Sequence, residues 1–119
     1  MADLSIARGE ELVVTGVATR SGGAIDITLA GSRIWFTAKK RVSDADAAAA
    51  IKKDAATAPA AALWGGVVRS AGGVYAVTVL DTDTTPFTVT ELLNWSIWLE
   101  EVDGTRTRLD HGTLKVQMA

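Results

Sequence analysis

Residues with catalytic chemistry are few and scattered along this chain. His111 is the single histidine and lies beside Asp110, a pairing that activates a serine or a water molecule in many hydrolases. Sequence neighbours in a strand point to opposite faces, and no serine has the context of a nucleophile elbow. We therefore interpret His111 as a turn residue between two strands and predict that the protein is not an enzyme.

Asp81 and Asp83 are the one weak candidate for a metal site. Two carboxylates separated by one residue in an exposed loop suit a hard cation such as calcium. No third carboxylate falls at the spacing of an EF-hand, so the alternative is a turn whose side chains bond to neighbouring backbone N–H groups. The chain has no cysteine, which excludes thiolate zinc sites and iron–sulfur clusters. We expect no metal and no cofactor.

The number of tryptophans is the most informative feature of the composition, with four tryptophans in 119 residues against one tyrosine. Strand alternation places Trp95 inside and leaves Trp35 and Trp98 pointing away from the core. Exposed tryptophans concentrate binding energy at protein interfaces, each contributing about 2 kcal/mol when fully desolvated. Two interpretations stay open: Trp35, Trp98 and Trp64 form an interface with another subunit, or the segment 43–62 or Trp64 covers the outward indoles within the monomer.

Charge and hydropathy exclude two classes of partner. Twelve basic and fourteen acidic residues give a net charge of −2 without the clustered Lys and Arg that nucleic acid binding requires. No apolar run approaches the roughly 18 residues that span a bilayer, and the N-terminus lacks the profile of a signal peptide. We expect a soluble, intracellular single domain over residues 1–119 that binds neither nucleic acid nor membrane.

Short alternating runs rich in valine and threonine predict a mostly β protein. A single sheet of this length would leave one apolar face in water, so the pattern predicts an all-β antiparallel sandwich of about seven or eight strands. The expected strands are Glu11–Thr19, Ile25–Leu29, Ser32–Val42, Leu63–Arg69, Val74–Leu80, Leu92–Val102, Thr105–Leu109 and Thr113–Met118.

One segment departs from the strand pattern. Ser43 and Asp46 have the spacing of a capping box ahead of several strong helix formers, which predicts a short helix from about Asp44 to Lys53. The alanine-rich stretch Ala55–Ala62, with Pro59, predicts a mobile connection that crosses from one sheet to the other. The sandwich should therefore carry one short helix in a crossover.

Register around Asp103-Gly104 poses a conflict. A strict two-residue hairpin loop would place Trp98 opposite Leu109, whereas the strand pattern favours Trp95, Ile97 and Leu99 as the buried set. Three large apolar residues outweigh one, so we expect a bulge or a longer loop to absorb the shift.

A set of short motifs follows one another in a recognisable order: Arg8-Gly9-Glu10, Gly22–Ile27, Ile34–Lys39 with the insertion after it, Gly72–Val77, Asp81–Thr84, Trp95–Glu100, Asp103-Gly104 and His111–Leu114. In this order of elements, nearly the whole chain resembles the N-terminal domain of phage baseplate upper proteins.

This resemblance implies an immunoglobulin-like sandwich that serves as a non-enzymatic building block of a tailed-phage or prophage virion. Its partners would be other tail or baseplate subunits, with copies of itself in a homo-oligomer, and it would reach the virion after assembly in the bacterial cytoplasm. Baseplate upper proteins usually continue into a linker or fibre segment, whereas this chain ends after the last strand, so a small stand-alone virion protein is an alternative to an adaptor. From the residues themselves, a carbohydrate-binding module that stacks sugar rings on Trp35, Trp64 or Trp98 is the alternative function.

Overall fold

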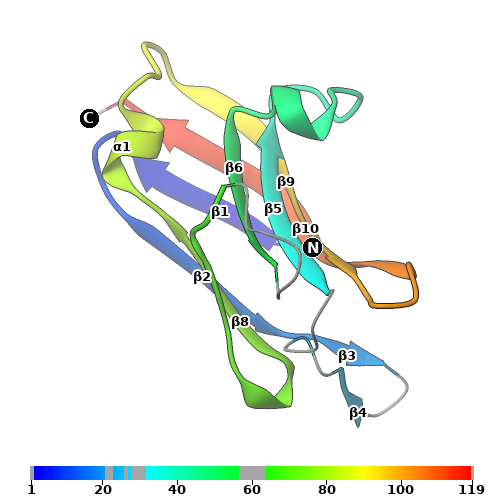
Figure 1. Cartoon of the computed structure of the whole chain (residues 1–119). Coiled ribbons are helices and arrows are strands. Elements are labelled where there is room, and N and C mark those ends of the chain that lie inside the picture. Colours follow the sequence, from blue (N-terminus) through cyan, green and yellow to red (C-terminus); the bar gives the residue numbers. More distant parts are fainter. Residues whose placement is uncertain (1, 21–22, 26, 28–31, 57–63, 119) are drawn as a thin grey trace.

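The computed structural model describes residues 2–20, 23–25, 27, 32–56 and 64–118. Within them, two β-sheets pack against each other and a two-stranded hairpin extends from one end (Figure 1). The larger sheet has the strand order β1-β10-β9-β5-β6, and the smaller has β2-β8-β7. The elements are β1 Ala2–Ala7, β2 Leu12–Val17, β3 Thr19–Arg20, β4 Gly23–Ala24, β5 Arg33–Lys39, η1 Asp46–Ala48, β6 Ile51–Ala56, β7 Val67–Arg69, η2 Ala71–Gly73, β8 Val74–Val79, α1 Asp81–Thr84, β9 Glu91–Glu100 and β10 Arg106–Gln117.

The connectivity is immunoglobulin-like, as expected. Strands β2, β8 and β7 occupy the places of strands B, E and D of such a sandwich, while β5, β9 and β10 occupy those of C, F and G. Strand β6 extends the larger sheet beyond β5, as in variable-type domains, and β1 closes its other edge by pairing parallel with β10. The all-β sandwich predicted from the alternating runs is therefore confirmed.

The core lies between the two sheets and is built from alternate positions of each strand. Ile34, Phe36 and Ala38 of β5 are fully buried, as their alternation predicted, and the Phe36 ring stacks on Trp95 with centroids 5.9 Å apart. The indole N–H of Trp95 donates to the backbone oxygen of Thr113 at 3.1 Å, so this buried polar group is satisfied. Tyr75 and Val77 of β8 close the core from the smaller sheet.

The register of the β9–β10 hairpin follows the strand pattern. Trp95, Ile97 and Leu99 are buried, and the pairing shifts between Arg108 and Asp110. The connecting loop is also longer than two residues, because the first bond across it joins the Glu101 N–H to the Thr105 oxygen at 2.8 Å. Both expected features, a bulge and a longer loop, are present and together resolve the conflict between the turn register and the strand pattern.

The predicted helix from Asp44 to Lys53 is wrong. A single 3-10 turn, η1, is followed directly by β6, which pairs along β5 from Arg33↔Ala56 to Ala38↔Ile51. Ile51, Lys53 and Ala55 are the inward, buried residues of β6. Sheet pairing and burial of Ile51 thus override the helical preference of the alanines. Residues 57–62 of the predicted connection lie outside the described residues, as does Leu63 at the start of the next predicted strand.

Within the described residues, the one short α-helix lies in a crossover, but in a later one than predicted. Helix α1 connects β8 of the smaller sheet to β9 of the larger sheet. Its first turn is held by the Asp83 carboxylate, which accepts the backbone N–H of Leu80 at 2.7 Å.

Two further strand predictions need correction. Strand β1 was not anticipated, although Ile6 alternates with exposed neighbours and is 4% exposed. The expected turn at Asp110–Gly112 is instead the middle of a continuous β10, whose bulge bends the strand without ending it. The expected strand Ile25–Leu29 lies mostly outside the described residues, within which Ile25 and Ile27 are buried.

Candidate functional site

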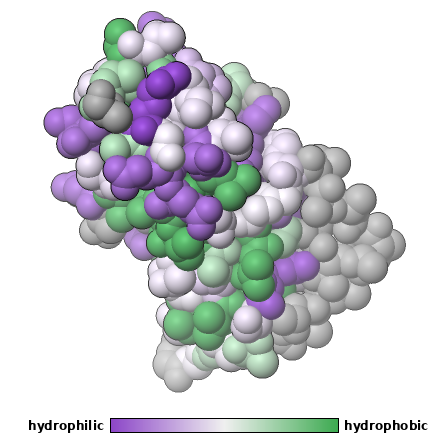
Figure 2. All heavy atoms as spheres, turned by 90° about the vertical axis from the view of Figure 1, so that its left-hand side faces the viewer, coloured by the Kyte–Doolittle hydropathy of each residue, from purple (hydrophilic) through white to green (hydrophobic). Residues whose placement is uncertain are grey.

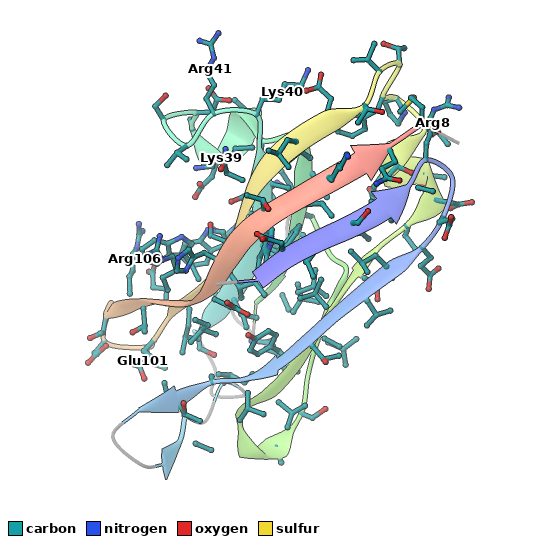
Figure 3. The ribbon with its side chains drawn as sticks, turned by 180° about the vertical axis from the view of Figure 1, so that it is seen from behind. Arg8, Lys39, Lys40, Arg41, Glu101 and Arg106 are labelled. Carbon is teal, nitrogen blue, oxygen red and sulfur yellow. The ribbon has the colours of Figure 1, made fainter. Side chains whose placement is uncertain are left out.

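The outer face of the five-stranded sheet carries an unusual concentration of tryptophan and arginine. We call this the aromatic face and define it by Arg33, Trp35, Trp64, Trp98, Arg106 and Arg108. Pairing sets the geometry, because Trp35 lies directly opposite Trp98 and Trp98 lies directly opposite Arg108 across β5, β9 and β10. Figure 3 shows Arg106 projecting on the same side of the sheet as Lys39.

Trp35 and Trp98 form a stacked pair with unequal exposure. Their ring centroids lie 6.4 Å apart with an interplanar angle of 16°. Trp35 is only 4% exposed, whereas Trp98 is partly exposed. The orientation of Trp35 away from the core is confirmed, and its burial matches the interpretation in which an outward indole is covered within the monomer. Trp98 alone of this pair presents indole surface to a ligand or partner.

The turn before β6 covers one side of Trp35. The indole N–H of Trp35 donates to the Asp46 carboxylate at 3.2 Å, and the Lys39 ammonium lies 2.7 Å from the other oxygen of that carboxylate. Part of the segment 43–62 therefore does contact an outward indole within the monomer. Coverage within the monomer therefore holds for Trp35, whereas Trp98 stays partly exposed and its role in an interface stays a prediction.

Arginine side chains fill the spaces between the indoles. The Arg33 guanidinium lies 5.0 Å from the ring centroid of Trp35 and 5.0 Å from that of Trp64. Arg106 approaches Trp35 to 5.7 Å, and Lys52 approaches Trp64 to 5.7 Å. Each contact is within the range of a cation–π interaction, so the cations help to fix the positions of both rings.

Asp54 organises the Trp64 end of this face and was missed by the sequence reasoning. Its carboxylate is fully buried: Oδ1 accepts the backbone N–H groups of Trp64 and Gly65 at 2.8 and 3.0 Å, and Oδ2 accepts Nε of Arg33 at 3.1 Å. The available signal was the alternation of Ile51, Lys53 and Ala55, which places Asp54 on the outer face of a strand. The prediction of a helix from Asp44 to Lys53 conflicts with that alternation, so the strand was not recognised.

A hollow of about 270 Å³ lies beside Trp98 on the same face. Its lining combines an indole with groups that donate or accept hydrogen bonds, among them Asn94, Ser96, Arg108 and His111. His111 lies opposite Ser96 across the sheet, and its backbone N–H donates to the Asp110 carboxylate at 2.8 Å. His111 is thus a strand residue in the wall of this hollow.

The geometry of Asp81 and Asp83 matches the turn alternative. Asp81 accepts the Thr82 N–H at 2.8 Å, while Asp83 of α1 forms a 2.7 Å ion pair with Lys53 of β6. Asp83 also lines a polar hollow of about 410 Å³ together with Lys40 and Glu91. Within the residues that the structure describes, no group of three or more metal-ligating side chains comes together, and no helix is long and apolar enough to cross a bilayer.

Neither the family models nor the curated proteins give a match to this sequence. Among solved structures, the chain is similar to AggA, the major subunit of aggregative adherence fimbriae type I from Escherichia coli. The TM-score is 0.27 and the identity 11%, over 100% of this chain and 91% of that one. A TM-score this low carries no argument about function, and the resemblance to phage baseplate upper proteins stays a prediction.

Proposed function

We propose that this protein is a non-enzymatic assembly subunit that binds a partner protein through the aromatic face. The observation that carries the proposal is the stacked pair, in which a buried Trp35 supports a partly exposed Trp98. Tryptophan and arginine dominate the energetic centres of protein interfaces. Rings already fixed by packing lose little conformational entropy on binding, so the free energy of contact appears as affinity.

The charge of the face favours a partner with carboxylates. Arg33 and Arg106 are paired with Asp54 and Glu100, whereas Arg108 lies open in the hollow beside Trp98. An acidic group on the partner would pair with that guanidinium, and an apolar side chain beside it would cover Trp98.

We further propose that the partner is another subunit of a phage or prophage tail or baseplate, and that the protein is located in the virion after assembly in the bacterial cytoplasm. The immunoglobulin-like sandwich and the order of its strands support this assignment, because they agree with the architecture that the resemblance implies. A homo-oligomer within that particle is part of the same proposal.

Incorporation into particles tests this function. The tagged chain is expressed in the bacterium that carries the gene, and tailed particles are purified and probed for it. We expect the wild type to co-purify with tails, Trp98→Ala to be lost, and Val102→Ala, in the exposed β9–β10 loop, to be retained. Co-purification of Trp98→Ala at the wild-type level contradicts the role of the aromatic face, and absence of the wild-type chain from every particle contradicts the virion assignment.

A carbohydrate-binding module is the second candidate, favoured by the hollow beside Trp98. An indole wall next to amide, hydroxyl and guanidinium groups suits a sugar ring, which needs an apolar face and several hydrogen bonds. Titration with a panel of neutral and acidic oligosaccharides, followed by tryptophan fluorescence, separates the candidates. Saturable quenching in the wild type that is absent from Trp98→Ala favours the sugar, whereas no response to any glycan favours the protein partner.

A further inference from the structure

The smaller sheet ends at a strand that has no neighbour on its outer side. In a constant-type immunoglobulin sandwich, strand A pairs with strand B at this edge of the sheet. Here β1 pairs with β10 of the larger sheet instead, and β2 takes the place of strand B. Within the described residues, no strand therefore occupies the place of strand A beside β2.

A backbone hydrogen bond at the end of β2 determines which of its groups face this open edge. The Ala18 N–H donates to the Gly73 oxygen at 2.8 Å, on the side of β8. The N–H and C=O groups of successive residues point alternately to the two sides of a strand. The even-numbered residues of β2 therefore bond to β8, whereas the backbone groups of Val13, Thr15 and Val17 point toward the open edge.

The far side of β8 gives the same alternation independently. The Thr78 N–H donates to the Gly66 oxygen at 3.0 Å, on the side of β7. The backbone groups of Val77, one residue earlier, must then face β2, where Val77 pairs with Val14. Val14 is an even-numbered residue, so both strands assign the odd-numbered residues of β2 to the open edge.

Natural sheets ordinarily protect their edges with charge, with short strands or with a covering segment. The outer edge of β6 is covered, because the Asp54 N–H donates to the Gly65 oxygen at 2.9 Å. Strand β7 has only three residues, and β1 exposes the carboxylate of Asp3. Strand β2 has six residues, Leu12–Val17, without a charge or a proline. An edge of this kind is typical of sheets that accept a strand from another chain.

We propose that the open edge of β2 binds an extended segment of a partner protein, which joins the smaller sheet as a fourth strand antiparallel to β2. Unpaired N–H and C=O groups at every second residue are complementary to the backbone of another strand. Pairing with Val13, Thr15 and Val17 requires at least about five residues of the segment.

Charge at one end of β2 specifies this segment further. Glu10 and Glu11 directly precede β2 and are both exposed. Figure 1 shows this connection at the upper left, and Figure 2, which views that side, shows a mostly hydrophilic upper part above a more hydrophobic lower part. An antiparallel segment places its C-terminal end beside these carboxylates. We therefore expect an uncharged stretch rich in β-branched residues, followed by one or two basic residues.

Amide hydrogen exchange tests whether the edge is open. In the free wild-type protein, the amides of Val13, Thr15 and Val17 should exchange at least about tenfold faster than those of Val14 and Gly16, which face β8. This measurement needs no ligand and does not depend on the function proposed for the aromatic face, which belongs to the larger sheet.

Two synthetic peptides of equal composition test the occupant. TVTVTVKK has its lysines at the C-terminal end, where an antiparallel strand meets Glu10 and Glu11, and KKTVTVTV is the matched control. In NMR titrations, TVTVTVKK should bind saturably with a dissociation constant below about 1 mM and shift the resonances of residues 13–17 most. The control should bind at least about threefold more weakly.

A proline at the centre of the edge tests the role of the backbone. Thr15→Pro removes an N–H that makes no bond to β8, whereas the matched Thr15→Ala keeps it. Thr15→Pro should weaken binding of TVTVTVKK at least about tenfold, while Thr15→Ala and Trp98→Ala should bind it within about twofold of the wild type. Thermal unfolding verifies each fold, and if Thr15→Pro does not fold, Val13→Pro and Val13→Ala replace the pair.

Four outcomes overturn the proposal. The amides of Val13, Thr15 and Val17 are as protected in the free protein as that of Val14, or TVTVTVKK does not bind at residues 13–17. Alternatively, KKTVTVTV binds equally well, or the proline and alanine variants bind the peptide with equal affinity. Protection of the edge amides that appears only as the concentration of the protein alone rises would assign the edge to a second copy and reject a different partner.

Discussion

Trp35 and Trp98 lie directly opposite each other on neighbouring strands and stack with their ring centroids 6.4 Å apart. Both point away from the core, yet one is 4% exposed and the other is partly open to solvent. The pair therefore has two layers, a buried ring and a partly exposed ring. In the function proposed above, the first ring serves stability and the second serves binding.

Alanine substitution of each ring should separate these two roles. Trp35→Ala removes a buried indole and leaves a cavity beside Trp98, so the free energy of unfolding should fall by about 3 kcal/mol. Trp98→Ala removes partly exposed surface and should cost about 1 kcal/mol. Denaturant titration measures both. Equal losses in the two variants would contradict the layered interpretation.

Local patterns predicted the five-stranded sheet well wherever one face alternates strictly. Ile34, Phe36 and Ala38 were identified as inward residues, and Trp95, Ile97 and Leu99 were preferred over the strict turn register. In both cases period-two burial is a strong signal, because a shift of one residue would expose every large side chain.

The failures fall where tertiary pairing overrides a local preference. The alanines after Asp46 have high helix propensity, but β6 gains backbone bonds along β5 that an isolated helix of this length would not replace. Alternation predicts the correct face for Trp35 but leaves its exposure open, because alternation gives the direction of a side chain and not what covers it. The partner of Trp35, Asp46, is eleven residues away and is brought into reach only by the turn that the helix prediction displaced.

Asp54 supplies a second prediction, because it joins two parts of the aromatic face through a buried carboxylate. Asp54→Asn removes the charge that pairs with Arg33 and should lower the free energy of unfolding by about 2 kcal/mol, within the range for hydrogen bonds to charged groups. It should also change the environment of Trp64, whose backbone N–H bonds to Asp54. Denaturant titration and the indole resonances report the two effects.

Glu100→Gln is the matched control for Asp54→Asn. Glu100 also pairs with an arginine of this face, Arg106, at 2.9 Å, but both side chains are exposed by a third or more. Exposed pairs of this kind contribute less than about 1 kcal/mol, so the control should unfold at nearly the wild-type denaturant concentration. A large loss in Glu100→Gln would show that charge, rather than burial, determines the effect.

Thr37 and Thr84 form a natural comparison of buried hydroxyl groups. Thr37 is 1% exposed, and within the described residues its hydroxyl has no hydrogen-bond partner. Thr84 is fully buried. Its hydroxyl donates to the backbone oxygen of Asp81 at 3.0 Å and accepts a hydrogen bond from the backbone N–H of Gly9 at 2.9 Å.

Replacement by the isosteric valine should change stability in opposite directions at these two positions. Thr37→Val removes an unsatisfied polar group and should raise the free energy of unfolding by about 1 kcal/mol. Thr84→Val leaves the Gly9 N–H without its acceptor and should lower it by about 1–2 kcal/mol. Differential scanning calorimetry measures both, and destabilisation by Thr37→Val would show that its hydroxyl has a partner.

Tyr75 should make the fold sensitive to alkaline pH. Burial of its phenol, and secondly the negative charge of Asp110, raise the pKa of Tyr75 above its ordinary value near 10. The unfolded chain then loses this proton at a lower pH than the folded chain does. The contribution of Tyr75 to stability is therefore fully present below pH 10 and is lost as the pH rises toward the raised folded-state pKa, by at most about 1.4 kcal/mol per pH unit.

Because Tyr75 is the only tyrosine, the ultraviolet absorbance of the phenolate reports this one group in the folded protein. The difference in unfolding free energy between the wild type and Tyr75→Phe should change across this pH range and stay constant below it, and Asp110→Asn should reduce the change. A phenolate titration at the ordinary pKa in the folded wild type would refute the proposed environment of Tyr75.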